Sequence, residues 1–384
     1  MRLAPSPVVS RTPAYEFIDG CTAIVRGALA AGCDFFAGYP ITPASGILSQ
    51  MVRELPLRGG VAIQGEDEIA SIGMCIGAAM AGATVMTATS GPGLSLYSEN
   101  IGLAIMGEVP IVIVDVQRAG PATGGATSVG QGDVQFVRWG TSGGLPIVAL
   151  APSSVAECET LTRRAFALAA RLRCPVFLLA DKELATTLAT VAVQPAAPAE
   201  RRAPAPAPVG DGFRPYRFEP PAAVPPLVPL GGSDRVRFTG SSHDECGRLT
   251  KDPRAVEALN RHLAEKIEAR AEELELVALD AQPGARTLLV SYGVSAGAMR
   301  EAAHAARRRG KRVSALTLGS LWPVPERAIK AAIEGASRVV VAELNRGDYR
   351  REVERLLAGA VPVVGVNRVD GDPLTPEEIE AAVP

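Results

Sequence analysis

An alternation of apolar runs and amphipathic stretches between residues 14 and 190 most constrains the fold of this chain. The run PIVIVDVQR at 110–118 is almost continuously apolar, as expected for a strand in a parallel sheet that is covered on both faces. The stretch EIASIGMCIGAAMAGA at 68–83 has helical apolar spacing. Strands that alternate with helices predict a doubly wound α/β domain with a mainly parallel sheet.

The same two patterns predict the other elements of this domain, to which we assign residues 14–192. A helix is expected over 16–32, where it stops at Gly32, and another over 154–174, where Ser154 caps it. Further strands are expected at CDFFAGYP (33–40), VAIQGED (61–67), TVMTATS (84–90) and PVFLLADKEL (175–184).

The composition changes after this domain. Residues 193–235 form a proline-rich linker, with eleven prolines between Gln194 and Leu230, which predicts an extended connection without helix or central strand. Residues 236–285 form a connecting segment with one amphipathic helix at 252–274, whose charges are expected to face solvent. A smaller α/β domain is predicted over 286–384, where four apolar runs alternate with helical stretches.

Charge and composition exclude several classes of protein. The net charge is −2 and no long basic run occurs, so we expect no nucleic-acid partner. No apolar stretch approaches the roughly 20 residues of a membrane span, and the N-terminus does not resemble a signal peptide, so we expect a cytoplasmic protein. The six cysteines form no CxxC pair and are expected to be small buried residues, so no metal site is predicted in this chain.

Unusual residues gather in the loops that follow four predicted strands. These loops are GYPITPAS, QGEDE, TSGPGLS and QRAGPATGGAT, and they are rich in Gly, Pro, Ser and Thr. Ligands of parallel α/β sheets bind at the carboxyl ends of the strands. The loops contain neither GxGxxG nor GxxxxGK[ST], so they predict a ligand site of a different kind from the common phosphate-binding motifs.

Three side chains in these loops are candidates for chemistry. Thr42 stands between two prolines, which fix the backbone and position its hydroxyl. Glu66 ends a strand, where burial would raise its pKa or pair it with a ligand nitrogen, whereas a plain helix start is the alternative for the acidic residues that follow it. Arg118 is either a surface cap or an anion clamp, which the hydroxyls of Thr123 and Thr127 would complete.

The motifs FFAGYPITPAS, GEDEIASIGMCIGAAMAGATVMTATSGPG, VDVQRAGPATG and QGDVQ together resemble the α subunit of 2-oxoacid:ferredoxin oxidoreductases, and the 2-oxoglutarate type most of all. The resemblance covers 14–190 and resumes over 236–370 with RFTGSSHDECGR and VVVAELNRGDYRREVERLL. It implies that the first domain is the pyrimidine-binding domain of a thiamine diphosphate enzyme. The smaller domain is then similar to the C-terminal domain of transketolase.

The resemblance also implies roles for residues. Glu66 matches the catalytic glutamate that hydrogen-bonds the aminopyrimidine ring of the cofactor. Thr42, Arg118, Thr123 and Thr127 match residues around the substrate carboxylate. Two further positions, Ser90 and Asn100, lie in matching cofactor-binding loops.

The family implies a shared active site. A separate β subunit supplies the binding site for the diphosphate and Mg²⁺ and carries a [4Fe-4S] cluster, and an α2β2 heterotetramer is expected. Coenzyme A accepts the acyl group, ferredoxin accepts the electrons, and the substrate is a 2-oxo acid.

Three alternatives stay open. Pyruvate or a branched-chain 2-oxo acid could replace 2-oxoglutarate, because the sequence offers no unique second cation for a distal carboxylate. Another two-subunit thiamine diphosphate enzyme is the second alternative. A single-chain enzyme of this kind should carry a GDG…N diphosphate motif, whereas the GDGF at 210–213 stands in the linker without a following helix. A non-enzymatic partner protein is the third, and the presence of Thr42, Glu66 and Arg118 argues against it.

Overall fold

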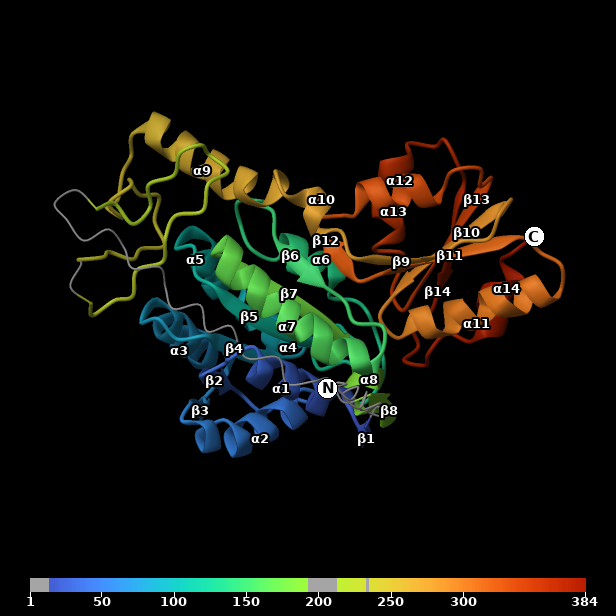
Figure 1. Cartoon of the computed structure of the whole chain (residues 1–384), viewed down its shortest axis with the longest axis horizontal. Coiled ribbons are helices and arrows are strands. Elements are labelled where there is room, and N and C mark those ends of the chain that lie inside the picture. Colours follow the sequence, from blue (N-terminus) through green and yellow to red (C-terminus); the bar gives the residue numbers. More distant parts are fainter. Residues whose placement is uncertain (1–13, 193–212, 233–234) are drawn as a thin grey trace, which may run out of the picture.

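The computed structural model describes residues 14–192, 213–232 and 235–384. Besides a two-stranded sheet, two larger sheets lie side by side: six strands of the first come from the first half of the chain, and the other is built from the C-terminal third (Figure 1). The helix that follows the linker, α9 (Pro253–Glu268), lies along the outside of the first unit and leads by α10 (Ala271–Leu274) into the second sheet.

The first sheet has seven strands in the order β12-β6-β7-β5-β4-β2-β3. Six of them are parallel, and β12 pairs antiparallel with β6. In chain order the strands are β2 (Phe35–Gly38), β3 (Val61–Gln64), β4 (Val85–Thr89), β5 (Ile111–Gln117), β6 (Val148–Leu150), β7 (Pro175–Asp181) and β12 (Ser320–Trp322). Every residue of β4, β5 and β7 is buried, which explains the continuous apolar runs.

Helices cover both faces of this sheet. Helices α1, α2 and α7 bury their apolar sides in one core, and α3, α4, α5 and α6 contribute to a second core on the opposite face. The helices of this unit are α1 (Gly20–Ala30), α2 (Ser45–Glu54), α3 (Glu68–Met80), α4 (Gly91–Leu96), α5 (Ser98–Met106), α6 (Val134–Trp139), α7 (Val155–Leu172), α8 (Lys182–Thr186) and the 3₁₀ turn η1 (Pro56–Arg58). The predicted α/β class with parallel sheets is confirmed.

The second sheet has five strands in the order β14-β13-β10-β11-β9, of which only β9 is antiparallel to its neighbour. One face of this sheet packs into the second core of the first unit, because buried residues of β10 and β11 belong to the same hydrophobic cluster as those of α3 and α5. Its strands are β9 (Val277–Asp280), β10 (Thr287–Tyr292), β11 (Val313–Leu318), β13 (Arg338–Glu343) and β14 (Val363–Asn367). Its helices are α11 (Ser295–Arg308), α12 (Glu326–Ala332), α13 (Arg350–Leu357) and α14 (Pro376–Ala381).

The N-terminal part of the first predicted helix is a strand. Residues Tyr15–Ile18 form β1, which pairs antiparallel with β8 (Ala189–Ala192). Asp19 then caps α1, because its carboxylate accepts a hydrogen bond from the amide of Thr22 at 2.8 Å. The prediction was wrong here because the strand depends on a partner more than 170 residues away, which local spacing does not reveal.

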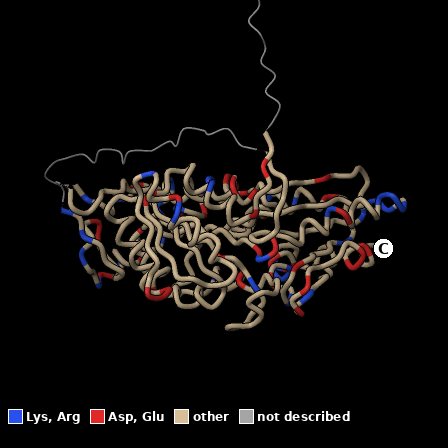
Figure 2. The backbone as a smooth tube through the Cα atoms, turned by 90° about the horizontal axis from the view of Figure 1, so that it is seen from below, with Lys and Arg blue, Asp and Glu red and all other residues tan. Residues whose placement is uncertain are grey.

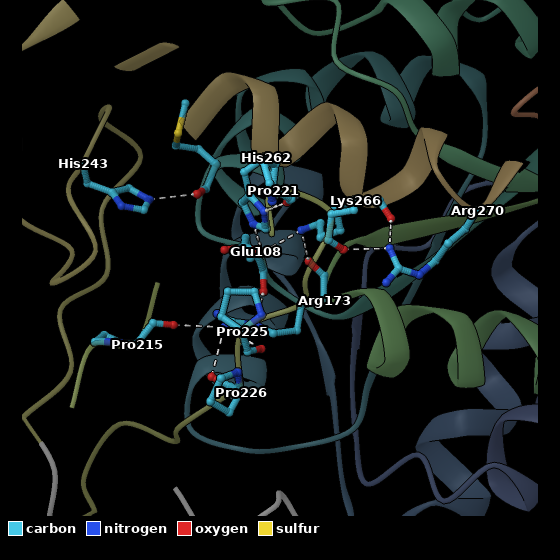
Figure 3. A network of polar contacts seen from close by, with 12 residues as sticks. Glu108, Arg173, Pro215, Pro221, Pro225, Pro226, His243, His262, Lys266 and Arg270 are labelled. Atoms are coloured by element: carbon cyan, nitrogen blue, oxygen red, sulfur yellow. Dashed lines mark hydrogen bonds and ion pairs between the residues drawn. The ribbon is translucent and has the colours of Figure 1, made fainter. Parts of the chain in front are cut away.

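Helix α9 is fastened by a buried ionic network (Figure 3). The carboxylate of Glu108 accepts hydrogen bonds from Lys266 Nζ at 2.8 Å and His262 Nε2 at 3.0 Å, and all three side chains are almost fully buried. Arg173 donates to the backbone carbonyls of Pro215, Pro225 and Pro226 and so holds the described part of the linker against the sheet. The expectation that the charges of this helix face solvent is therefore wrong for His262 and Lys266.

Charges elsewhere are mixed in sign. Figure 2 shows basic and acidic residues interspersed along the tube in both units. Five of the six cysteines are buried and the sixth is partly buried, as expected for small core residues. Among the described residues, no helix is both long enough and apolar enough to cross a bilayer.

Candidate active site

The candidate site lies at the carboxyl edge of the first sheet. Because β3, β2, β4, β5 and β7 are parallel neighbours, the loops after them meet at the same edge. These loops carry Thr42, Glu66, Ser90 and Arg118. The sequence prediction that four strand-end loops line one region therefore follows from the observed topology.

Arg118 ties two of these loops together. Its side chain is only 6% exposed, and its guanidinium donates to the carbonyl of Thr42 at 2.5 Å and to the carbonyl of Thr123 at 3.2 Å. Its Nε has no hydrogen-bond partner among the described residues. The structure thus brings Arg118 and the YPITP turn together, and one buried donor is left for a ligand.

The threonines around Arg118 differ from the expected arrangement. The side chains of Thr42, Thr123 and Thr127 are exposed, and it is the carbonyls of Thr42 and Thr123 that contact the guanidinium. The hydroxyls are therefore open to a ligand rather than bonded to Arg118. The loop that carries Thr123 folds back on itself, since the amide of Gly125 donates to the carbonyl of Ala119 at 2.8 Å.

Glu66 is exposed in this chain, which corrects the expectation that it is buried. The physical reason is that β3 is the edge strand of the sheet, so no neighbouring strand-end loop covers its carboxyl end on that side. The next two residues behave as helix-start residues: Asp67 caps α3 by accepting from the amide of Ala70 at 2.7 Å, and Glu68 is buried. Glu66 is therefore free of the helix cap and faces outward.

The loop after β4 brings backbone close to buried polar groups. Ser90 is fully buried and its hydroxyl has no partner among the described residues. A Cβ on Gly93 would lie 2.1 Å from Thr89 Oγ1 and 2.8 Å from Glu68 Oε1, so only glycine fits there. Asn100 is different: it lies partly buried on α5 beyond this turn, and the structure shows no polar contact between it and the described loops.

A cavity of about 450 Å³ opens beside Arg118. It is bounded by the start of α4, by the loop that follows β5 and by the turn that follows β13, which brings Asn345 and Arg346 to its wall. Arg346 is exposed on this wall. The second unit therefore contributes a cation to the region of Arg118, and sequence reasoning did not identify it because the two arginines stand more than 220 residues apart.

Gln131 joins the two units next to this cavity. Its side chain donates to the carbonyl of Tyr292 at 3.2 Å and accepts from the amide of Leu344 at 2.9 Å. Asn345 donates to the carbonyl of Gln131 at 2.8 Å. These bonds fix the loop of Arg118 against the turn of Arg346. The only sequence signal for Gln131 was its place in the QGDVQ motif.

Sequence reasoning missed three carboxyl groups near the loop of Arg118, of which two are buried and one, Asp133, is partly buried on the wall of the cavity. Asp115 in β5 and Asp181 in β7 are fully buried, and Asp133 precedes α6. Burial raises the pKa of Asp181 to about 7 and that of Asp133 to about 6. Burial, and then the carboxyl of Asp133, raise the pKa of Asp115 well above its usual range.

Comparisons with known proteins agree with this geometry. Residues 26–259 match the family model described as pyruvate flavodoxin/ferredoxin oxidoreductase, thiamine diphosphate-binding, and residues 285–379 match that of core domain II of pyruvate:ferredoxin oxidoreductase. The chain therefore belongs to the 2-oxoacid:ferredoxin oxidoreductase family, and it is similar to α-type subunits of these oxidoreductases, as the sequence predicted.

Two curated relatives show how far the similarity extends. The 2-oxoglutarate synthase subunit KorA of Methanocaldococcus jannaschii is 40% identical over 372 residues, which cover 96% of this chain and 99% of the relative. The ketoisovalerate oxidoreductase subunit VorB of Methanothermobacter thermautotrophicus is 37% identical over 368 residues, which cover 94% of each chain.

A solved structure has the same fold. The 2-oxoglutarate:ferredoxin oxidoreductase from Magnetococcus marinus, solved with 2-oxoglutarate, coenzyme A and succinyl-CoA bound, superposes with a TM-score of 0.88 at 30% identity. The match covers 96% of this chain and 64% of the other chain, so this chain spans less than two thirds of that protein's length.

Proposed function

We propose that this chain is the α subunit of a 2-oxoglutarate:ferredoxin oxidoreductase, which converts 2-oxoglutarate and coenzyme A to succinyl-CoA and carbon dioxide and passes two electrons to ferredoxin. The observation that carries the proposal is the strand-end edge, where Arg118 binds the YPITP turn after β2 and the exposed Glu66 follows the neighbouring strand β3. Similarity to KorA subunits over nearly the full length supports 2-oxoglutarate as the substrate.

The residues of this edge fit one half of thiamine diphosphate. Ser90 offers a buried hydroxyl without a partner among the described residues, and Glu66 offers an exposed carboxylate. We assign the aminopyrimidine end to this chain because of these two residues. We assign the diphosphate, Mg²⁺ and the [4Fe-4S] cluster to a β subunit, as the resemblance to the family implies.

Glu66 has the role of proton holder in this proposal. When bound, thiamine diphosphate supplies a carbon nucleophile and takes up the electron pair released with carbon dioxide. Glu66 holds a proton between its carboxyl and a ring nitrogen of the aminopyrimidine, which favours the imino form that serves as the base. Its exposure in the isolated chain matches a residue that becomes covered when the partner subunit binds.

Arg118 has the role of anchor for the substrate. Its side chain lines the cavity and pairs with the carboxylate of the 2-oxo acid. Thr42, Thr123 and Thr127 have exposed side chains in the adjoining loops, and their role around this carboxylate remains a prediction. Asn100 shows no contact with these loops, and its assignment to the cofactor site remains a prediction.

Arg346 supports a dicarboxylic substrate. It places a second positive charge on the wall of the cavity that contains Arg118. A 2-oxo acid with a distal carboxylate gains from this charge, whereas pyruvate and branched-chain 2-oxo acids have no group that can pair with it. We assign the distal carboxylate of 2-oxoglutarate to Arg346 on this basis.

The proposed partners follow from the same assignment. We propose an α2β2 assembly with the β subunit, with coenzyme A as the acyl acceptor and ferredoxin as the electron acceptor. A cytoplasmic location remains a prediction. The test is to co-purify this chain with a β subunit and measure dye reduction that depends on both 2-oxoglutarate and coenzyme A.

A further inference from the structure

Residues 213–232, which we call the strap, offer more carbonyl oxygens than amides for hydrogen bonds. Six of them are prolines, which have no backbone N–H. Arg173 and Arg270 donate to four of the strap carbonyls, and His262 Nδ1 lies 2.6 Å from the carbonyl oxygen of Pro221 (Figure 3). An arginine stays charged in proteins, so His262 is the member of this set that can lose its charge near neutral pH.

The buried ring of His262 faces an acceptor at each nitrogen. Its Nδ1 lies 2.6 Å from the carbonyl oxygen of Pro221, and its Nε2 lies 3.0 Å from Oε2 of Glu108. A carbonyl and a carboxylate only accept hydrogen bonds, and a neutral imidazole has a single N–H. Glu108 is a carboxylate here, because Lys266 Nζ donates to the same oxygen at 2.8 Å. His262 therefore makes both hydrogen bonds only as an imidazolium.

A second buried histidine has the same arrangement. His243 Nδ1 lies 3.0 Å from the carbonyl oxygen of Asp244, and its Nε2 lies 3.2 Å from the carbonyl oxygen of Met106. The carboxylate of Asp244 accepts instead from the amides of Cys246 and Arg248, at 2.9 Å each. Both acceptors of His243 are backbone carbonyls, so this ring also needs a proton on each nitrogen to make both bonds.

Aromatic side chains of the strap pack on both histidines. The ring centroid of Tyr216 lies 4.3 Å from that of His243, and the ring of Phe218 stacks on His262 at 4.0 Å. The face of an aromatic ring attracts a cation, so these contacts favour the charged form of a histidine. The strap therefore touches each histidine through an aromatic ring, and it touches His262 also through a carbonyl.

Charged groups of both signs surround the two rings. Around His262, the carboxylate of Glu108 favours the second proton, whereas Lys266 on the same helix opposes it. Arg173, at the end of α7, donates to the backbone carbonyl of Glu108 at 3.3 Å and also opposes it. The charged neighbour of the other ring is Asp244. The second protons are thus held by hydrogen-bond acceptors rather than by a surplus of negative charge.

We propose that His243 and His262 are buried imidazolium rings that hold the strap closed, and that the strap loosens when the rings lose their second protons. The charge of Glu108 favours the neutral tautomer that keeps its proton on Nε2, so the bond lost at His262 is the one to Pro221. The closed strap binds protons that the open strap releases. Closure is therefore stable at low pH and weakens as the pH rises.

The closed strap covers apolar surface. A cavity of about 340 Å³ lies between strap residues 224–227 and the beginnings of β4 and β5, and Phe166 of α7 forms part of its wall. Loosening of the strap exposes this wall to solvent. The strap is thus a pH-sensitive cover on the first unit, and it does not depend on the proposed activity.

Nitrogen NMR of the full chain, labelled at histidine, gives the first test. The chain has three histidines, so single substitutions to Gln assign every signal. At about pH 6, long-range proton–nitrogen correlations should show a proton on both nitrogens of His243 and His262, with the exposed His304 as reference. A ring of either buried histidine with a bare nitrogen at this pH would overturn the proposal.

Hydrogen exchange of the full chain gives the second test. The strap amides of Tyr216 and Leu230 donate to the carbonyls of Glu245 at 3.1 Å and Met80 at 2.8 Å, so their exchange reports on closure. Their protection, corrected for the intrinsic rate at each pH, should fall about tenfold as the rings lose their second protons, whereas protection of the β5 amides stays constant.

The exchange result can contradict the proposal in two ways. Strap protection that is constant from about pH 6 to about pH 9.5 removes the pH sensitivity. Protection that falls while both rings keep their protons shows that another group controls the strap.

Substitutions then assign the effect to the two rings. His262→Gln keeps a neutral donor but cannot bond to both acceptors, so strap protection at about pH 6 should fall about tenfold. The double variant with His243→Gln should have no pH dependence. His304→Gln, at an exposed position of α11, is the matched control and should behave as the wild type. A wild-type pH dependence in the double variant contradicts the proposal. The wild-type titration decides the question if the variants do not fold, and none of these measurements needs turnover.

Discussion

At the scale of single residues, Glu66 is the side chain on which the proposed chemistry depends most. Glu66→Gln keeps the shape but cannot hold the proton in the same way, so turnover should fall by about 10³-fold. Steady-state dye reduction by the complex measures this loss. Glu99→Gln, on the exposed side of α5, serves as the control and should retain activity. Comparable activity in both variants would remove Glu66 from the mechanism.

Arg118 allows a prediction about the substrate alone. Arg118→Lys keeps a positive charge but loses the planar pair of donors, so kcat/KM for 2-oxoglutarate should fall by about 100-fold. The KM for coenzyme A should not change and acts as the internal control. Since Arg118 also bonds to the carbonyls of Thr42 and Thr123, thermal unfolding must show that the loops are intact. An unaltered substrate dependence in a folded variant would exclude the clamp.

The sequence predicted which loops carry these residues, but not how exposed their side chains are or what lies next to them. Thr42, Glu66, Ser90 and Arg118 were placed in strand-end loops by the helix and strand patterns, and the structure has them there. The exposure of Glu66 was not predictable, because strand order decides which loop lies at the edge. The burial of Asp115 and Asp181 was hidden for the same reason, since an isolated aspartate in an apolar strand does not reveal what covers it.

At the scale of elements, the attachment of α9 depends on the charges around Glu108. Although burial opposes ionisation, Lys266, His262 and Arg173 hold the pKa of Glu108 well below its usual range. Its contribution to stability is therefore present above the unfolded pKa, about 4.3, and is lost as the pH falls below that value. The network joins α9 to the loop that precedes β5.

Lys266→Met should destabilise the chain by about 3–5 kcal/mol, because it leaves the buried Glu108 without its closest ammonium partner. Adding Glu108→Gln should restore part of this loss. Urea unfolding measures both. Lys330→Met, which breaks an exposed pair with Glu326 at 3.4 Å, is the matched control and should cost less than about 1 kcal/mol. Equal effects of the two lysine variants would show that the network does not fasten α9.

Strands were predicted correctly where the strand itself is a long apolar run. The fully buried β4, β5 and β7 were recognised as apolar runs, whereas the three-residue β6 and β12 were missed because they are too short for any periodicity. The buried face of α9 was missed because Lys266 and His262 look polar in sequence, and only their partners make burial favourable. The first three residues of the GDGF motif, 210–212, lie outside the described part of the chain.

At the scale of the whole molecule, the contact between the two units should determine substrate choice. Arg346→Leu should lower kcat/KM for 2-oxoglutarate by about 10–100-fold and leave that for 2-oxoisovalerate nearly unchanged. Arg355→Leu, in α13 of the second unit and paired with Glu352 and Glu326, is the control. A selective rise in the KM for coenzyme A would instead assign Arg346 to the acyl acceptor.

The most direct test of the central claim is an assay of this chain alone and together with a β subunit. Reduction of a viologen dye is followed with thiamine diphosphate, coenzyme A and 2-oxoglutarate, and the assay is repeated with pyruvate and 2-oxoisovalerate. We expect no activity from the chain alone and activity in the complex with a preference for 2-oxoglutarate, because the proposal assigns only one side of the site to this chain. A stable complex that oxidises none of the three acids would contradict the account.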